Sequence, residues 1–384
     1  MQSKILVKLK YHIINKGEFL MHTEEFFYSE ATKRFIDYSS KDATAIIAHE
    51  HGILGLARLI ACLDSLGLDY NETFMIALPD FTYTRNPNRW GAGFPYGCIV
   101  NIPKSDTPFI PIDFRPNCCG VVFAEIPDFS QNLEDFRDNY YTVINKYEKI
   151  HTNDLNRRNH FLAIYRSKKN NKYYCLLHCS FKYVKQSLYS EHNPAIKGVK
   201  VFNYLSKNFH YLINEDAIEY YNAYKQYEKD TLHLRKMIIK ELFNDAQILF
   251  NKTHEGFLDN NTLLLGAYAN DEKFTYPLML SPESNLYIVC VEKAIKIGSG
   301  NSLYCAPHGG GYALDAVISA QKLNKSCAPQ EEYLLKYSNN CAFVTNNILD
   351  MPFNYRSNTA NDWCSKYSMA SIKDILIPLI NLKL

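Results

Sequence analysis

The chain has 384 residues, enough for one large domain or for two to three smaller ones, and a formal net charge of only +2. That balance gives no overall sign of nucleic-acid binding, although a local basic groove is compatible with it. No run of about 18 apolar residues is present and the first residues lack a signal-peptide core, so we expect a soluble, cytoplasmic protein without a membrane partner.

The N-terminal third of the chain predicts a helix and several short strands. Residues 1–41 are mixed and polar, and we expect loop and short strand there, before a main domain of residues 42–384. Apolar runs predict a buried strand over Ala43–Ala48 and an amphipathic helix over Ile53–Leu66, which Gly67 ends.

A short apolar strand over Phe74–Leu78 runs into Pro79 and Asp80. Because proline cannot donate to a sheet, we expect the strand to end at Pro79 and to place Asp80 just after its C-terminal end. That position is common for a working carboxylate, and an Asx turn is the alternative.

Apolar runs predict most of the remaining elements. Strands are expected over Tyr96–Val100, Phe109–Asp113, Val121–Ile126, Tyr287–Glu292 and Ile375–Leu382, and helices over Leu133–Lys146 and Ile218–Leu242.

Two adjacent cysteines, Cys118 and Cys119, precede Gly120 in a tight turn between two predicted strands. The chain has 11 cysteines without a CxxC repeat, which does not indicate a disulfide framework and leaves room for metal ligation. A thiolate in such a turn can face a cavity and bind a metal, whereas most free cysteines are ordinary buried side chains. The neighbouring glycine favours Cys119 as the ligand.

Two predicted strands, Asn159–Arg166 and Lys172–Cys179, flank a loop typical of a β-hairpin. With a five-residue loop, His160 lies opposite His178, and directly opposed Cβ atoms are about 5 Å apart. That spacing suits two imidazoles on one metal ion. A register change of one residue would place the two histidines on opposite faces.

His308 lies between a proline and three glycines, Gly309, Gly310 and Gly311. A glycine triplet is costly in backbone entropy, so it is typical of positive φ angles or of close approach of a ligand to the main chain. We therefore expect His308 to be presented to a ligand, and a glycine-rich turn with an incidental histidine is the alternative.

In their order along the chain, these motifs resemble those of the RtcB RNA-splicing ligase family. The resemblance covers about residues 74–383 through short motifs, and the matching positions are Pro79-Asp80, Cys119-Gly120, Asn159-His160-Phe161, Leu177-His178, His254-Glu255, His308 to Tyr312, Pro352 to Arg356 and the C-terminal Lys383.

The resemblance implies an α+β fold, one large domain with mixed sheets around a central cleft and flanking helices. It implies a metal centre with Cys119, His160, His178 and His254 as ligands, which in the family holds manganese. It also implies GTP and RNA ends as partners. Ligand softness also allows zinc. His308 would take GMP from GTP as a phosphoramidate, and Asp80 would hold its imidazole in the reactive tautomer.

The implied nucleotide contacts come from several separate segments. Asn159 would touch the phosphates, Ser281 and Lys383 the guanine edge, and Tyr355 would stack on the base, while the three glycines would let the nucleotide approach the main chain. The family passes GMP to an RNA 3′-phosphate, and a 5′-hydroxyl then displaces it. Cyclic 2′,3′-phosphate ends are first opened by hydrolysis.

Several family positions differ in this chain. Pro116 stands where the family has a metal-binding aspartate, so one metal position lacks a carboxylate unless Asp113 or Asn117 provides the ligand. Ala163 stands where the family has a carboxylate that binds the guanine edge. Tyr312 stands where an arginine belongs, and other basic positions are lost in Leu264–Ala267 and Cys179–Tyr183. Three hypotheses remain: a divergent RNA ligase, a binding protein for a metal with a nucleotide or an RNA end, and a metal-dependent phosphoesterase.

Overall fold

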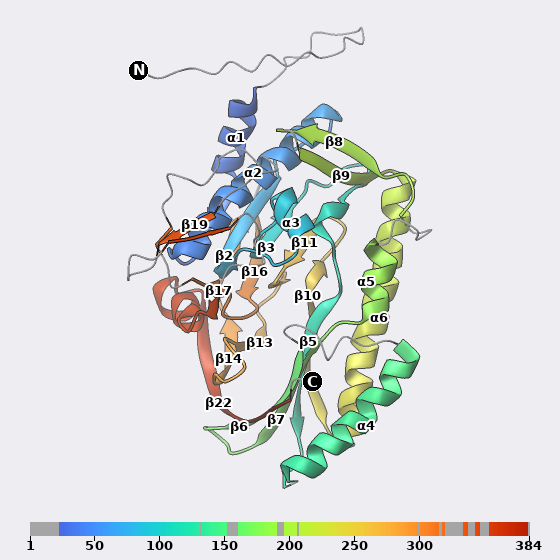
Figure 1. Cartoon of the computed structure of the whole chain (residues 1–384), viewed down its shortest axis with the longest axis vertical. Helices are drawn as coiled ribbons and strands as arrows, with labels where there is room; N and C mark the ends of the chain where they lie inside the picture. Colours follow the sequence, from blue (N-terminus) through green and yellow to red (C-terminus); the bar gives the residue numbers. More distant parts are fainter. Residues whose placement is uncertain are drawn as a thin grey trace.

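Eleven strands form one curled sheet in the computed structural model of the chain (Figure 1). The structure describes residues 23–130, 132–151, 160–189, 196–205, 207–297, 300–314, 317–318, 333–336, 342–345 and 353–382. The strands, in sheet order, are β1 (Phe35–Asp37), β2 (Phe74–Thr82), β3 (Tyr96–Asn101), β11 (Thr262–Leu265), β10 (Gln247–Phe257), β5 (Cys119–Ile126), β7 (Tyr173–Cys179), β6 (Phe161–Ser167), β22 (Ala370–Leu382), β14 (Leu286–Val291) and β13 (Thr275–Met279).

Neighbouring strands in this sheet are antiparallel, except that β1 and β2 run parallel. Four smaller sheets accompany it, made of β12 (Ala267–Asn270), β16 (Asn301–Pro307) and β15 (Ile295–Ile297); β17 (Tyr312–Ala313) and β21 (Asn354–Tyr355); β18 (Val317–Ile318), β19 (Tyr333–Lys336) and β20 (Ala342–Thr345); and β4 (Phe109–Pro111), β9 (Lys207–Ile213) and β8 (Lys200–Tyr204).

Most of the helices cover one face of the large sheet, and α4 and α6 lie side by side along it (Figure 1), whereas Ala360 of α7 belongs to the core on the other face. The helices are α1 (Glu24–Lys33), α2 (Ala43–Ser65), α3 (Pro87–Ala92), α4 (Leu133–His151), α5 (Lys182–Tyr189), α6 (Glu215–Leu242) and α7 (Thr359–Asn361), with a 3₁₀ turn at Ile112–Phe114 and a π-helical turn at Asp362–Lys366. The combination confirms the α+β class.

Two hydrophobic cores lie on the two faces of the sheet. One contains the apolar faces of α2, α4 and α6, and the other contains β12, β15, β16 and the inward side chains of β5, β6 and β7. Alternation along β5 shows the division, because Val122 and Ala124 join the helix-side core while Val121 and Phe123 join the opposite one. Side chains at alternate positions of a strand therefore lie on the same face of the sheet.

The strand predicted over Ala43–Ala48 is wrong, because these residues open the long helix α2. Asp42 caps that helix, since its side chain accepts a hydrogen bond from the backbone N–H of Ala45. The helix is buried on most sides, so its sequence lacks the polar stripe that distinguishes a helix from a buried strand. Gly67 follows with a φ of 69°, as expected for a helix stop.

Among the described helices, α2 alone is long and apolar enough to cross a membrane by length and composition. Of its most apolar window, 83% is buried inside the protein, which is the placement of a core helix. His51 on this helix is buried against Trp90, with ring centroids 3.8 Å apart. Gly55 approaches α3 closely, and a Cβ there would lie 2.0 Å from the carbonyl oxygen of Gly93.

Other predicted boundaries also move. The described part of the predicted N-terminal segment contains α1 and β1, and β1 pairs with β2 of the main sheet. Strand β2 does not end at Pro79 but continues to Thr82. Its pairing with β3 is interrupted between Ala77 and Thr82. Pro79 lies in this interruption, where no backbone N–H is needed for hydrogen bonding to the neighbouring strand.

Candidate active site

Four neighbouring strands each bring one predicted metal ligand to the same end of the sheet. In the order β10, β5, β7, β6 they carry His254, Cys119, His178 and His160, the last residue lying immediately before β6. All four side chains are buried. Residues separated by up to 135 positions in the sequence, from Cys119 to His254, therefore meet because the strands are neighbours.

The donor atoms of three of these residues converge closely. The Sγ atom of Cys119 lies 3.3 Å from Nε2 of His160 and 3.2 Å from Nε2 of His178. The three donors all lie within 4.8 Å of one another, which is close enough for a single metal ion. His254 adjoins them, with its Nε2 3.3 Å from that of His178 and its Nδ1 3.2 Å from the hydroxyl of Tyr268.

The hairpin register differs from the predicted one by one residue. His178 pairs with Phe161, and Arg166 pairs with Tyr173, because the N–H of Ser167 donates to the carbonyl oxygen of Lys172, so that Ser167 instead of Arg166 faces Lys172. Asn171 closes this turn with a φ of 61°. His160 still reaches His178, since it lies before the first paired residue of β6, and the ring centroids are 5.2 Å apart.

Cys119, and not Cys118, faces the cluster. Cys118 has a φ of 56° and belongs to the helix-side core. Burial raises the pKa of the Cys119 thiol well above its ordinary value, and the nearby Glu255 carboxylate adds to this. Burial also lowers the pKa of His254 well below its ordinary value, helped by His308 and His178. A neutral imidazole is the ligating form, whereas the thiol must lose its proton to a metal.

His308 and Asp80 form a hydrogen-bonded pair beside this cluster. Oδ2 of Asp80 lies 2.6 Å from Nδ1 of His308 and accepts from the backbone N–H groups of His308 (3.0 Å) and Gly309 (3.3 Å). Asp80 is fully buried, and the His308 ring centroid is 4.8 Å from that of His254. With Nδ1 facing the carboxylate, Nε2 is the free nitrogen.

Two glycines of the triplet pack directly against the backbone of neighbouring segments. A Cβ on Gly310 would lie 2.4 Å from the carbonyl oxygen of Leu280, and one on Gly311 would lie 2.3 Å from that of Asp80. Gly311 also has a φ of 67°, in the left-handed region. These two positions therefore have no room for a side chain.

A pocket opens over His308, His178 and His254. Its described lining combines these histidines with apolar side chains, backbone and a few hydroxyls: Thr82, Tyr96, Val121, Phe161, Leu176, Pro277, Met279, Leu280, Ser281, Pro282, Gly309, Gly310, Gly311, Tyr312 and Tyr355. Ser281, Tyr355 and the three glycines thus lie where a bound molecule would contact them. Asn159 and Lys383, predicted to bind the nucleotide, lie outside the described residues, as do residues 351–352.

The two polar residues that could have replaced the lost metal-binding aspartate do not face the cluster. Asp113 binds His210, with an oxygen 3.0 Å from Nδ1 and another 2.7 Å from the backbone N–H. The Asn117 side chain donates to Glu255 and accepts from the Cys119 backbone N–H at 2.7 Å. Pro116 itself is buried and provides no ligand atom.

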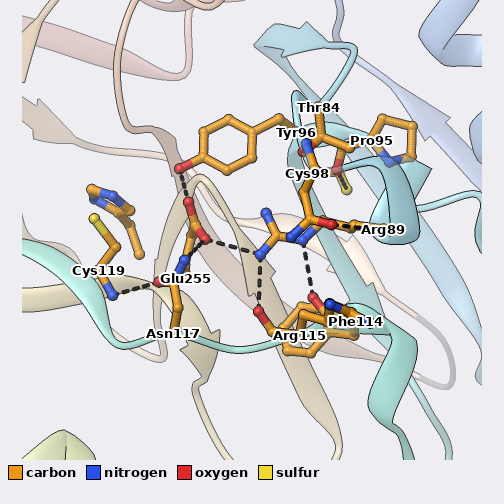
Figure 2. A network of polar contacts seen from close by, with 12 residues as sticks. Thr84, Arg89, Pro95, Tyr96, Cys98, Phe114, Arg115, Asn117, Cys119 and Glu255 are labelled. Atoms are coloured by element: carbon orange, nitrogen blue, oxygen red, sulfur yellow. Dashed lines mark hydrogen bonds and ion pairs between the residues drawn. The ribbon is translucent and has the colours of Figure 1, made fainter. Parts of the chain in front are cut away.

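Glu255 is the centre of a buried polar network that the sequence did not predict (Figure 2). Its carboxylate accepts hydrogen bonds from Arg89 (3.0 Å), Asn117 and the hydroxyl of Tyr96. Burial acts to raise the pKa of Glu255, but Arg89 and Tyr96 outweigh it and lower the pKa to about 2. Arg89 also donates to the carbonyl oxygens of Phe114 and Arg115, so the network fixes the segment that leads to Cys119.

Tyr96 connects this network to the pocket. Its ring contacts His308 edge to face, with centroids 4.8 Å apart, while its hydroxyl donates to Glu255. Only the adjacency of Glu255 to His254 in the sequence could have suggested the network. No protein-family model matches the chain, and no curated protein matches it in sequence.

Proposed function

We propose that the protein is a divergent RtcB-like ligase that joins RNA 3′-phosphate or cyclic phosphate ends to 5′-hydroxyl ends through a nucleotide carried on His308. The observation that carries this proposal is that His308, which is paired with Asp80, and His178, which belongs to the Cys119, His160 and His178 cluster, line the same pocket. The RtcB-like arrangement of residues 42–384 and a cytoplasmic location are part of the same proposal.

His308 would act as the nucleophile. With its Nδ1 proton donated to Asp80, its Nε2 lone pair attacks the α-phosphorus of GTP, forming a P–N bond as the bond to pyrophosphate breaks. The RNA 3′-phosphate then takes the GMP from His308, and a 5′-hydroxyl displaces GMP to leave a phosphodiester. Asp80 keeps the ring oriented throughout, because three donors from the glycine loop and the ring meet its Oδ2.

Cys119, His160 and His178 would hold a divalent metal, with His254 adjoining. When bound, such an ion neutralises and polarises phosphoryl oxygens. One thiolate with imidazoles suits zinc at least as well as the manganese expected from the resemblance, because manganese prefers oxygen ligands. The described carboxylates nearest the cluster bind other partners, since Glu255 bonds Arg89 and Asp80 bonds His308. The fit is therefore to a sulfur- and nitrogen-bound ion.

The test is covalent labelling. Wild-type protein incubated with GTP labelled on its α-phosphate, with either manganese or zinc, should retain label in an acid-labile linkage that maps to His308. His308→Ala should lose it, whereas His233→Ala, at an exposed position of α6, should keep it. Wild-type protein that takes no label from GTP, ATP, CTP or UTP with either metal would refute the ligase proposal.

A phosphoesterase is the second candidate, and one observation favours it. The described residues that line the pocket include no lysine or arginine. A triphosphate carries more negative charge than a single phosphate group and would need such side chains more. In that case, phosphate release from cyclic-ended RNA would survive His308→Ala and be lost in His160→Ala. A binding protein would take up metal and show neither activity.

A further inference from the structure

Arg235 is a fully buried residue of α6 that contacts three of the ligand-bearing strands at once. Its Nη1 donates to the carbonyl oxygens of Cys118 (3.1 Å) and Cys179 (3.2 Å), and its Nε donates to Oδ1 of Asn251 (3.1 Å). Cys118 immediately precedes β5, Cys179 ends β7, and Asn251 lies on β10. Figure 1 shows α6 running along these strands on the helix-covered face.

Each of these contacts lies next to a candidate ligand in the sequence. Cys118 precedes Cys119, Cys179 follows His178, and Asn251 lies three residues before His254 on the same strand. One guanidinium group therefore forms hydrogen bonds at three strands, and each bond lies within three residues of a candidate ligand in the sequence. Because its N–H groups form a rigid planar fork, the group also fixes the spacing of the strands it joins.

The peptide bond between Cys118 and Cys119 is held at both ends. Its carbonyl oxygen accepts from Arg235, and its N–H donates to Asn117, which in turn bonds Glu255 (Figure 2). Cys118 has a φ of 56°, a conformation that costs energy in a residue with a side chain and persists only where the surroundings impose it. The direction of the Cys119 side chain is thus set by Arg235 and Asn117.

Stability alone does not account for Arg235. Its Nη2 atom makes no hydrogen bond, and none of the ion pairs among the described residues includes it. Burying a guanidinium without a carboxylate is unfavourable, and hydrogen bonds to neutral oxygens offset that cost only in part. A buried charge that forms no ion pair with a described carboxylate and contacts three ligand strands points to a role in the site.

We propose that Arg235 is a positioning residue that holds Cys119, His178 and His254 in their metal-binding arrangement before the ion arrives. This inference rests on the proposed metal centre. Side chains that orient metal ligands typically contribute about 10- to 100-fold to metal affinity. Removing Arg235 should therefore weaken binding by about that factor without unfolding the protein.

The experiment compares wild-type protein with Arg235→Met and Arg235→Lys. Zinc affinity is measured by competition with a chelator, ligand geometry by the thiolate-to-metal absorption of the cobalt-loaded protein, and stability by thermal unfolding of the apoprotein. Arg235→Met should bind zinc about 10- to 100-fold more weakly, with an altered cobalt spectrum. It should also melt at a lower temperature than the wild type, because the Cys118 and Cys179 carbonyl oxygens lose a donor, so zinc affinity is compared at a temperature where both apoproteins are folded. Arg235→Lys keeps the charge but not the fork, so it should also lose affinity.

Arg58→Met is the matched control. Arg58 is equally buried on α2, where it donates to the carbonyl oxygen of Gly91, and α2 carries none of the candidate ligands. This variant should bind zinc as the wild type does. If Arg235→Met does not fold, Arg235→Lys decides the question by the same measurements.

Two failures are distinguishable. A wild-type protein that binds neither zinc nor cobalt would refute the metal centre itself, and the positioning role with it. A wild type that binds zinc while the folded Arg235 variants match it within about twofold, with the same cobalt spectrum, would refute the positioning role and leave the metal centre standing.

Discussion

Replacement of Asp80 by asparagine tests the proposed role of His308 most directly. One oxygen of Asp80 accepts three hydrogen bonds, from Nδ1 of His308 and from the N–H groups of His308 and Gly309. Its other oxygen, Oδ1, is buried and makes no hydrogen bond. The amide of Asp80→Asn must therefore either turn its nitrogen toward three donors or bury that nitrogen without an acceptor.

Both orientations of the amide have a cost. Loss of a hydrogen bond to a charged group costs about 1.5–3 kcal/mol, so we expect the variant to be less stable by roughly that amount. If the amide nitrogen faces the ring, it donates to Nδ1 and moves the imidazole proton to Nε2, the nitrogen that must attack. In serine proteases, the change that gives the wrong tautomer lowers kcat about 10⁴-fold. We expect labelling of His308 to slow by about 10³- to 10⁴-fold, with metal content unchanged.

The assay is the single-turnover rate of label transfer from α-labelled GTP, measured with saturating metal. Asp113→Asn is the matched control, because Asp113 is also a buried aspartate bonded to a histidine but lies outside the pocket. It should label at the wild-type rate. A rate for Asp80→Asn within about tenfold of wild type would contradict the tautomer argument, as would an equal loss in Asp113→Asn.

Three further outcomes follow from other parts of the structure. Metal content measured by elemental analysis should be lost in Cys119→Ala and kept in Cys118→Ala; loss in both would show that only the fold of the turn matters. Burial, with smaller contributions from neighbouring cations, lowers the pKa of His51 from 6.5 to about 3, so only the unfolded chain binds its proton between these values. Unfolding free energy should therefore fall by about 1.4 kcal/mol per pH unit from pH 6.5 toward 3, a slope that chemical denaturation should find reduced in His51→Phe. Gly55→Ala should destabilise the protein by about 3 kcal/mol, since backbone lies 2.0 Å from the new Cβ, whereas Gly91→Ala, with nothing within 4 Å, should melt like wild type.

Local sequence signals indicate several residues of the candidate site. The proline and three glycines around His308 indicated a backbone that approaches a ligand or another chain segment, and Gly310 and Gly311 do approach Leu280 and Asp80 too closely for a side chain. The hairpin pattern brought His160 near His178, but not by the predicted direct opposition: Phe161 pairs with His178, and His160 reaches it from just before the first paired residue of β6. These signals are local because glycine geometry and strand periodicity act over a few residues.

The error at Ala43–Ala48 shows where local patterns fail. A segment buried on all sides has no polar stripe, so a core helix and a buried strand have the same appearance in the sequence. The N-cap at Asp42 was the remaining signal for a helix.

The sequence by itself determined which residue types are present for the proposed metal and phosphoryl chemistry and which short segments carry them. Only the tertiary structure decided that His254, Cys119, His178 and His160 come from four neighbouring strands, because strand order depends on pairings between distant segments. It also decided the partners of the buried charges, Glu255 with Arg89 and Arg235 with Cys118 and Cys179. A buried charged group requires partners from whatever elements pack against it, and no spacing along the chain specifies those elements.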